Sequence, residues 1–455
     1  METTLPTINS TKEAPFEGDL MERTIPAAAL RTLVDTFSDG CVMGLNGKWG
    51  SGKTTFLKMW EKYMEKLGYK VIHFNSWEND DIEDPLIAII AEFQNLTGKD
   101  SAKWIAFTNS IGKISLAMLP NNILGALTTH LTGLPLDKII ERAGDKSVEI
   151  LSKSIDKYFE QKRSIKEFKK ALKGYVEENA NGKPIIFVID ELDRCNPIFA
   201  VKTLERIKHL FEVENIVYLL AMDDVQLANS IRGFYGSEQF DAKDYLRRFI
   251  HISYDLPTSN GENIVNTLYE TYNYSKLNEK IKKYESDFKE LPVFIRSLYE
   301  DRNMSIRQLE QYMLSLRIVI ESMVGLAFSA TTIALMTLLK LHDTVFFEKY
   351  INYVVDDNEF IKYIEEHFGI GLLEGTTTVS MLYFYQSVAD MMIIRYIPEE
   401  REKSLIDKDG NLKFKITKFD SEQFPRCFIN IDSTMPGLDV IRGKMGMLSS
   451  YNLNL

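Results

Sequence analysis

The fold follows from one stretch near the start of the chain, Gly44-Leu45-Asn46-Gly47-Lys48-Trp49-Gly50-Ser51-Gly52-Lys53-Thr54-Thr55. Within it, Gly47 to Thr54 matches the phosphate-loop pattern, in which a glycine and four further residues precede Gly-Lys-Thr. An apolar run leads into the loop and a helical pattern, Phe56–Trp60, leads out, so strand, loop and helix stand in the required order. The stretch therefore predicts a binding site for a nucleoside triphosphate, and the alternative is a glycine-rich surface turn.

The residue types in this loop suit phosphate. Glycines permit positive φ and close approach of the backbone to a ligand. Successive backbone N–H groups then converge on the phosphates, aided by the positive end of the following helix. We expect Lys53 to reach the β- and γ-phosphates of ATP and the Thr54 hydroxyl to bind Mg²⁺. The predicted nucleotide contacts in the loop are Gly47, Lys48, Trp49, Gly50, Ser51, Gly52, Lys53, Thr54 and Thr55.

The composition is that of an ordinary globular chain, and 455 residues are enough for two or three domains. A net charge of −11 disfavours nonspecific binding of nucleic acid by the whole surface but leaves a local basic groove open. Three widely spaced cysteines and six histidines offer neither a disulfide framework nor a zinc cluster, which fits a reducing compartment. The polar segment Met1–Asp19 lacks the apolar core of a signal peptide, so we expect a cytoplasmic protein.

Apolar runs alternate with helical patterns through the first half of the chain, which predicts a parallel α/β sheet. The expected strands are Cys41–Asn46, Lys70–Asn75, Pro184–Ile189, Ile216–Met222 and Ile250–Ser253. Nearly unbroken apolar runs are typical of parallel strands that helices cover on both faces. The predicted fold class is therefore α/β, a parallel five-stranded P-loop NTPase sheet with a large helical insertion.

The chain is expected to divide into several parts. We expect a flexible arm at 1–18, the core at 19–257 with an insertion at about 80–183, and a helical lid at 258–345. A mostly helical region follows at 346–455, with a hairpin near 405–418 that turns at Asp409-Gly410.

Two segments of the insertion leave alternatives open. Ile114–Leu136 has no formal charge and the length of a membrane span, yet Pro120, His130 and several polar residues interrupt it. A buried helical hairpin or a partner-facing surface competes there with membrane association through 114–136. Lys157–Lys173 is rich in lysine, which indicates either the solvated face of an amphipathic helix or a contact surface for nucleic acid or acidic lipid.

The chemistry of hydrolysis predicts a second group of residues, at the end of the third strand, Asp190-Glu191-Leu192-Asp193-Arg194. Phosphoryl transfer needs a metal site and a positioned water. Asp190 ends an apolar strand and is the expected Mg²⁺ contact, while Glu191 is placed to orient and deprotonate the attacking water. The alternatives are an acidic loop that begins an exposed helix and, for Asp193 and Arg194, an ion pair that shapes the turn.

Further along the chain, four polar residues are candidates for the site. Asp223 follows the fourth strand and is either a sensor of the γ-phosphate or a helix N-cap. Arg247 and Arg248 precede the fifth strand, where either an arginine finger for a neighbouring subunit or a surface ion pair is expected. Arg307 lies in the first turn of a helix opened by the capping box Ser305–Gln308, against the helix dipole, which hints at a nucleotide contact.

Together these residues resemble the KAP family of P-loop NTPases over about residues 19–320. The resemblance rests on the loop with Trp49 inside it, Phe74-Asn75-Ser76-Trp77, Asp190–Cys195, and Tyr245-Leu246-Arg247-Arg248 ahead of Leu256-Pro257. It implies an AAA+/STAND-like core with the fourth strand between the loop strand and the Asp190 strand. It also implies that Arg248 stands at a usually basic position, that Arg307 resembles a lid arginine, and that Glu191 replaces a frequent second aspartate.

The expected function is an ATPase that drives or gates an oligomeric assembly. The resemblance implies membrane helices in many members at the insertion, and a bacterial anti-phage system in which the ATPase acts on a protein partner. We therefore expect a homo-oligomer with ATP and Mg²⁺ as cofactors and a partner protein from the same system. A slowly hydrolysing nucleotide switch and a nucleic-acid motor that uses Lys157–Lys173 are the alternatives.

Overall fold

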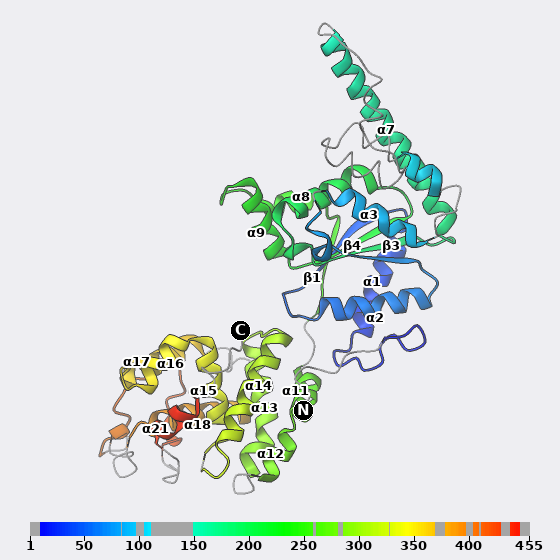
Figure 1. Ribbon diagram of the computed structural model, residues 1–455. Helices are drawn as coiled ribbons and strands as arrows, with labels where there is room; N and C mark the ends of the chain where they lie inside the picture. The colour runs from blue at the N-terminus through cyan, green and yellow to red at the C-terminus, as the bar shows by residue number, and fades with distance from the viewer. Residues whose placement is uncertain are drawn as a thin grey trace. The chain divides into compact units, whose positions relative to one another are not determined.

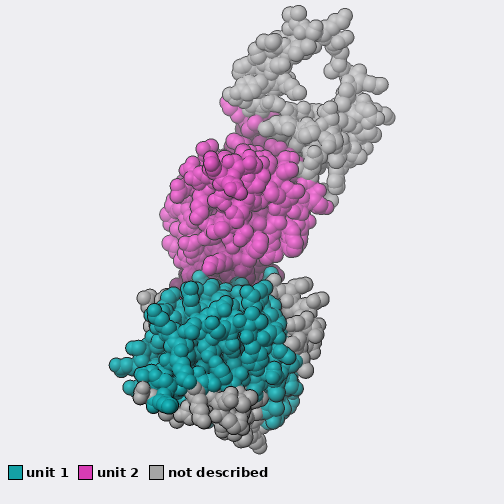
Figure 2. All heavy atoms as spheres, turned by 90° about the vertical axis from the view of Figure 1, so that its left-hand side faces the viewer, with its two compact units in different colours: residues 1–7, 259–455 teal, residues 8–258 magenta. Residues whose placement is uncertain are grey.

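The computed structural model describes residues 10–82, 84–96, 104–110, 149–257, 261–280, 285–326, 328–368, 378–396, 404–408, 411–428 and 437–445. The chain forms two compact units that divide after residue 258 (Figure 2). What we call the first unit, residues 8–258 (magenta, unit 2 in the key of Figure 2), contains the phosphate loop. The second unit (teal, unit 1 in that key) contains the helices that follow residue 258.

The first unit is built on a five-stranded sheet whose pairs are all parallel. Its strands are β1 (Cys41–Asn46), β2 (Val71–Asn75), β3 (Ile185–Asp190), β4 (Ile216–Met222) and β5 (Ile252–Asp255), in the order β2-β3-β4-β1-β5. The predicted fold class is confirmed, including the place of the fourth strand between the loop strand and the Asp190 strand. The fifth strand begins at Ile252 rather than at Ile250.

Helices cover both faces of this sheet (Figure 1). Alternate side chains of a strand point to opposite faces, and in the buried strands both sets are apolar, so each face forms its own hydrophobic core. Ile186 and Val188 pack with α1 (Thr24–Thr36) and α2 (Lys53–Lys66). Phe187 and Ile189 pack on the other face with the remaining helices of the unit. These are α3 (Pro85–Phe93), α7 (Glu149–Asn179), α8 (Pro197–Arg206) with the π-helical turn η4 (Ile207–Phe211), α9 (Asp224–Tyr235) and α10 (Ala242–Arg247).

The insertion is described only in part. Its helix α7 buries Phe168 and Leu172 in the core, as the amphipathic interpretation of Lys157–Lys173 predicts, and Lys173 pairs with Glu214 at 2.5 Å. The side chains of this segment up to residue 162 lie outside the described part, as does the uncharged segment 114–136. In the part of the chain that the structure describes, every helix is too short or too polar to cross a bilayer.

The second unit is helical. Helix α15 (Ala330–His342) is buried almost throughout and packs on α14 (Ile306–Ser322) and α18 (Thr378–Ile393). Around them lie α11 (Gly261–Thr271), α12 (Tyr274–Lys280), α13 (Glu285–Asp301), α16 (Thr344–Ile351), α17 (Asp357–His367), α20 (Gln423–Arg426) and α21 (Leu438–Met445). An antiparallel bridge joins Ile406 and Leu412 in the expected hairpin, whose turn Asp409-Gly410 lies outside the described residues.

Glu365 of α17 is a buried carboxylate that holds a neighbouring loop in this unit. Only 1% of the residue is exposed, and its carboxylate accepts backbone N–H bonds from Thr417 and Lys418 at 2.7 Å and from Phe419 at 3.0 Å. Burial by itself would raise the pKa of Glu365, but these donors and the Thr417 hydroxyl outweigh it, so the pKa lies below its ordinary value.

We predict that Glu365→Gln destabilises the protein by about 2 kcal/mol at neutral pH, because an amide cannot accept all four bonds. A pKa lowered by folding contributes stability above the unfolded pKa of about 4.3, and this contribution is lost as pH falls through the folded pKa. Urea titrations at several pH values should therefore show the difference from wild type shrinking below about pH 4. The neighbouring exposed Glu366→Gln is the control, and equal stability of the two variants would contradict the assignment.

Candidate functional site

The phosphate loop lies between β1 and α2, at the carboxyl ends of the strands, and its backbone depends on glycine. Gly50 and Gly52 have φ of 77° and 84°, in the left-handed region that favours glycine. A Cβ on Gly47 would lie 2.9 Å from the Ser51 hydroxyl oxygen and 3.2 Å from the Lys53 side chain. A side chain at position 47 would therefore crowd Ser51 and Lys53.

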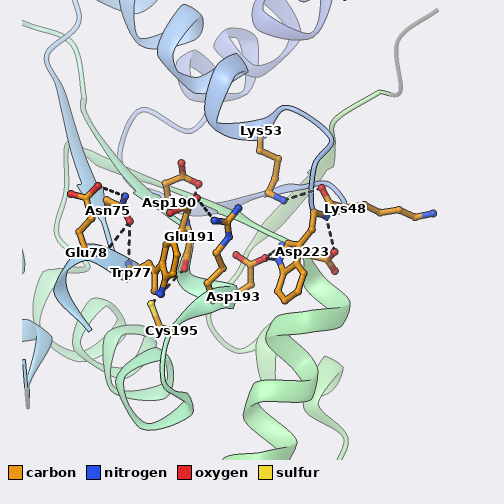
Figure 3. A network of polar contacts seen from close by, with 12 residues as sticks. Lys48, Lys53, Asn75, Trp77, Glu78, Asp190, Glu191, Asp193, Cys195 and Asp223 are labelled. Carbon is orange, nitrogen blue, oxygen red and sulfur yellow. Dashed lines mark hydrogen bonds and ion pairs between the residues drawn. The ribbon is translucent and has the colours of Figure 1, made fainter. Parts of the chain in front are cut away.

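Lys53 is folded over this loop. Its ammonium donates to the carbonyl oxygen of Gly47 at 2.5 Å and, as Figure 3 shows, to that of Lys48, at 3.3 Å. The residue is 9% exposed. Burial lowers the pKa of the Lys53 ammonium, while the carboxylates of Asp193, Asp223 and Asp190 oppose that shift. The phosphate loop thus contains a buried ammonium group, which has three N–H donors.

Asp190 ends β3 directly beside the start of α2. It is 1% exposed, the Glu191 backbone N–H donates to its Oδ1 at 2.9 Å, and the Thr54 hydroxyl lies near its carboxylate. Burial raises the pKa of the Asp190 carboxyl, and the Thr54 hydroxyl together with the positive charges of His73 and Lys53 opposes the rise. The structure thus brings together the two residues predicted to hold Mg²⁺, with the hard oxygen atoms that this ion prefers.

Glu191 adopts an unusual backbone conformation at the end of the same strand. Its φ of 59° is left-handed, which costs a non-glycine residue about 1 to 3 kcal/mol and is a feature that clusters at functional sites. Its carboxylate pairs with Arg194 at 2.9 Å, and the Arg194 guanidinium lies 5.4 Å from the centre of the Trp77 ring. The ion pair between Asp193 and Arg194, left open as an alternative, is not among the described salt bridges, because Arg194 turns toward Glu191 and Trp77.

Asp193 instead joins the phosphate loop to the end of β4. Its Oδ2 accepts the indole N–H of Trp49 at 2.5 Å and the backbone N–H of Asp223 at 3.0 Å. Asp223 in turn accepts the Trp49 backbone N–H at 3.2 Å and caps α9 through Val225 and Gln226. The helix N-cap expected for Asp223 is thus present, and its role as a γ-phosphate sensor stays a prediction.

The predicted arginines lie elsewhere. Arg248 follows α10 and is exposed, before the amino end of β5, whereas the phosphate loop lies at the carboxyl ends of the strands. Arg247 is 79% exposed and lies 4.0 Å from Asp244, the surface ion pair expected as its alternative. Arg307 is exposed on α14 in the second unit, where the capping box Ser305–Gln308 is confirmed. The structure therefore does not bring these arginines to the loop within the first unit.

One residue that contacts the loop has no signal in the sequence. Arg23 is 1% exposed and precedes α1, where its guanidinium donates to the carbonyl oxygens of Ser51 at 3.1 Å and Pro257 at 2.7 Å. It also lies 5.9 Å from the centre of the Phe56 ring. These contacts connect the loop to the segment that precedes α1 and to Pro257. A single arginine that binds distant backbone carbonyls produces no recognisable sequence pattern.

Comparison with known proteins supports this description. A family model, the KAP family P-loop domain, matches residues 24–323. Among solved structures, the Aeropyrum pernix ORC2 protein in ADPNP and ADP complexes is similar, with 12% identity over 94% of this chain and 95% of that chain. The TM-score of 0.29 is too low to establish a shared fold, and no curated protein matches. Because the family model spans more than half of the chain, the protein belongs to the KAP family of P-loop NTPases.

Proposed function

We propose that the protein binds ATP with Mg²⁺ and hydrolyses its β–γ phosphoanhydride. One observation carries the proposal: Thr54, which directly follows Lys53 on the phosphate loop, lies beside the buried carboxylate of Asp190, with Glu191 next in sequence. Phosphoryl transfer requires a cation over the phosphates, a metal site and a group that positions water, and these residues supply each at one place. Family membership supports the same activity.

The donors fit Mg²⁺ in a particular way. No group of three or more histidine, cysteine, aspartate or glutamate side chains suited to a metal occurs among the described residues. Mg²⁺ is commonly held by one or two protein oxygens together with phosphate oxygens and water, so Thr54 and Asp190 would hold it only with the nucleotide. When bound, the ion neutralises charge on the phosphates. Lys53 and the loop N–H groups orient the triphosphate, and Glu191 orients the attacking water and accepts its proton.

The proposal includes assembly. An exposed Arg248, remote from the loop of its own subunit, suits an arginine that reaches the site of a neighbour in a homo-oligomer. We further propose that hydrolysis drives or gates this assembly on behalf of a protein partner, and that the system is a bacterial anti-phage defence. These last two points rest on the resemblance to the family alone.

A second candidate function is a slowly hydrolysing nucleotide switch. It is favoured by the pairing of Glu191 with Arg194 at 2.9 Å, because the guanidinium occupies the carboxylate that would otherwise hold the attacking water. In that function, nucleotide state would change which surface is exposed to a partner. The two functions share the binding site and differ in turnover.

We predict that Glu191→Gln retains ATP binding and loses steady-state hydrolysis by about 100-fold or more, as expected when a general base is removed. Phosphate release and calorimetric titration with ATP and Mg²⁺ measure the two properties separately. Glu238→Gln, an exposed residue of the same unit, is the matched control and should behave as wild type. Negligible turnover in the wild type, together with an ATP-dependent change in assembly, would favour the switch over the hydrolase.

We predict that Arg248→Ala abolishes hydrolysis while sparing ATP binding, since the arginine would act on a neighbouring subunit. Mixing this variant with Glu191→Gln should restore part of the activity, because each intact site could then pair an intact glutamate with an intact arginine. Arg232→Ala on α9, whose guanidinium bonds Asn229 at 2.7 Å, is the control. Unchanged hydrolysis in Arg248→Ala would contradict the proposal that Arg248 acts in the site of a neighbouring subunit.

A further inference from the structure

Asp193 is a buried acidic residue that the proposed chemistry does not use. It lies in the turn η3 (Leu192–Arg194) after β3, is 7% exposed, and pairs with neither Arg194 nor any other arginine in the described salt bridges. Burying a carboxylate is costly unless hydrogen bonds satisfy it. The hydrogen-bond donors that contact Asp193 therefore indicate its role.

Two hydrogen-bond donors reach the same carboxylate oxygen of Asp193. The indole N–H of Trp49 and the backbone N–H of Asp223 donate to Oδ2 of Asp193, at 2.5 and 3.0 Å. Trp49 belongs to the phosphate loop and Asp223 ends β4, so one oxygen ties three chain segments together. Asp223 closes the set by accepting the Trp49 backbone N–H at 3.2 Å.

The Trp49 side chain needs this contact to be oriented. Large aromatic side chains are generally well buried, but Trp49 is 45% exposed. Packing alone therefore does not fix the orientation of its ring. A hydrogen bond to an ionised acceptor is about twice as strong as one between neutral groups. Because the backbone N–H of Trp49 also belongs to the loop that faces the phosphates, orienting this residue sets the shape of the loop.

We propose that Asp193 is a positioning residue for the phosphate loop: through the Trp49 indole and the Asp223 backbone it fixes the loop against the ends of β3 and β4, and so sets the affinity for ATP. This inference rests on the proposed function. It assigns to Asp193 no contact with nucleotide or with reacting atoms.

The test compares ATP binding in variants that carry Glu191→Gln, so that hydrolysis does not interfere. Asp193→Ala and Trp49→Phe should each raise the Kd for ATP with Mg²⁺ by about tenfold, the effect of losing roughly one good hydrogen bond. The double variant should show about the same loss as Asp193→Ala alone, because Asp193→Ala already removes the contact that Trp49→Phe removes. Losses that multiply, or an unchanged Kd in both single variants, would overturn the proposal.

Asp193→Asn separates the hydrogen bonds from the charge. Since both donors meet one oxygen, an asparagine can present its amide oxygen there and keep both bonds while losing the charge near Lys53. We expect its Kd to stay within about threefold of the Glu191→Gln parent. A Kd as weak as that of Asp193→Ala would show that charge, not positioning, is the role of the residue. Asp81→Asn, an exposed carboxylate of the same unit, is the control.

A measurement without nucleotide keeps this test separate from that of the proposed function. In protein labelled with ¹⁵N-tryptophan, Trp49→Phe identifies the Trp49 indole N–H resonance among the four tryptophans. Asp193→Ala should move that resonance upfield, because a short bond to a carboxylate is lost, while Asp81→Asn should leave it in place. An unmoved resonance would refute the Trp49–Asp193 contact even if ATP binds. A moved resonance with no ATP binding in the parent would support the contact and refute its link to ATP affinity together with the proposed function.

Discussion

Lys53 and three carboxylates, Asp190, Asp193 and Asp223, are buried together at the carboxyl edge of the sheet. Burying charged groups is costly in free energy unless they are paired or hydrogen-bonded. Here each group has partners in another segment of the same chain. Thr54 of the loop lies beside Asp190, Trp49 of the loop donates to Asp193 and Asp223, and Lys53 lies among the three acids. The phosphate loop and the ends of β3 and β4 thus supply one another with hydrogen-bond partners.

This arrangement follows from the order of the strands. Because β4 lies between β1 and β3, Asp190 at the end of β3 and Asp223 after β4 lie at the same edge of the sheet. The loop that follows β1 lies at this edge too. The cluster holds more negative than positive charge, and a divalent cation bound between Asp190 and a triphosphate would screen these two anionic groups from each other. A single architectural feature therefore accounts both for the buried acids and for the ligand that the site suits.

Much of the fold and part of the site could be predicted from sequence, for physical reasons. Buried parallel strands are unbroken apolar runs, and their ends carry the polar residues, so the meeting of Thr54 and Asp190 was foreseeable. The partners of Asp193, Arg194 and Arg23 were not. A hydrogen bond from Arg23 to the carbonyl of Pro257, which lies 234 residues away in sequence, depends on backbone atoms that every residue possesses. Likewise, neighbouring Asp193 and Arg194 suggest an ion pair, but the turn that follows the strained Glu191 sends them to different partners.

The central claim is that this edge of the sheet binds a triphosphate together with Mg²⁺, and titration calorimetry of the wild type and Lys53→Ala tests it most directly. The account predicts saturable binding of ATP at one site per chain, tightened by Mg²⁺ and lost in Lys53→Ala. Lys53 is the cation that lies over the loop, and Thr54 and Asp190 can hold the ion only with phosphate present. Equal affinity of the wild type and Lys53→Ala for ATP, with no effect of Mg²⁺ on either, would contradict it.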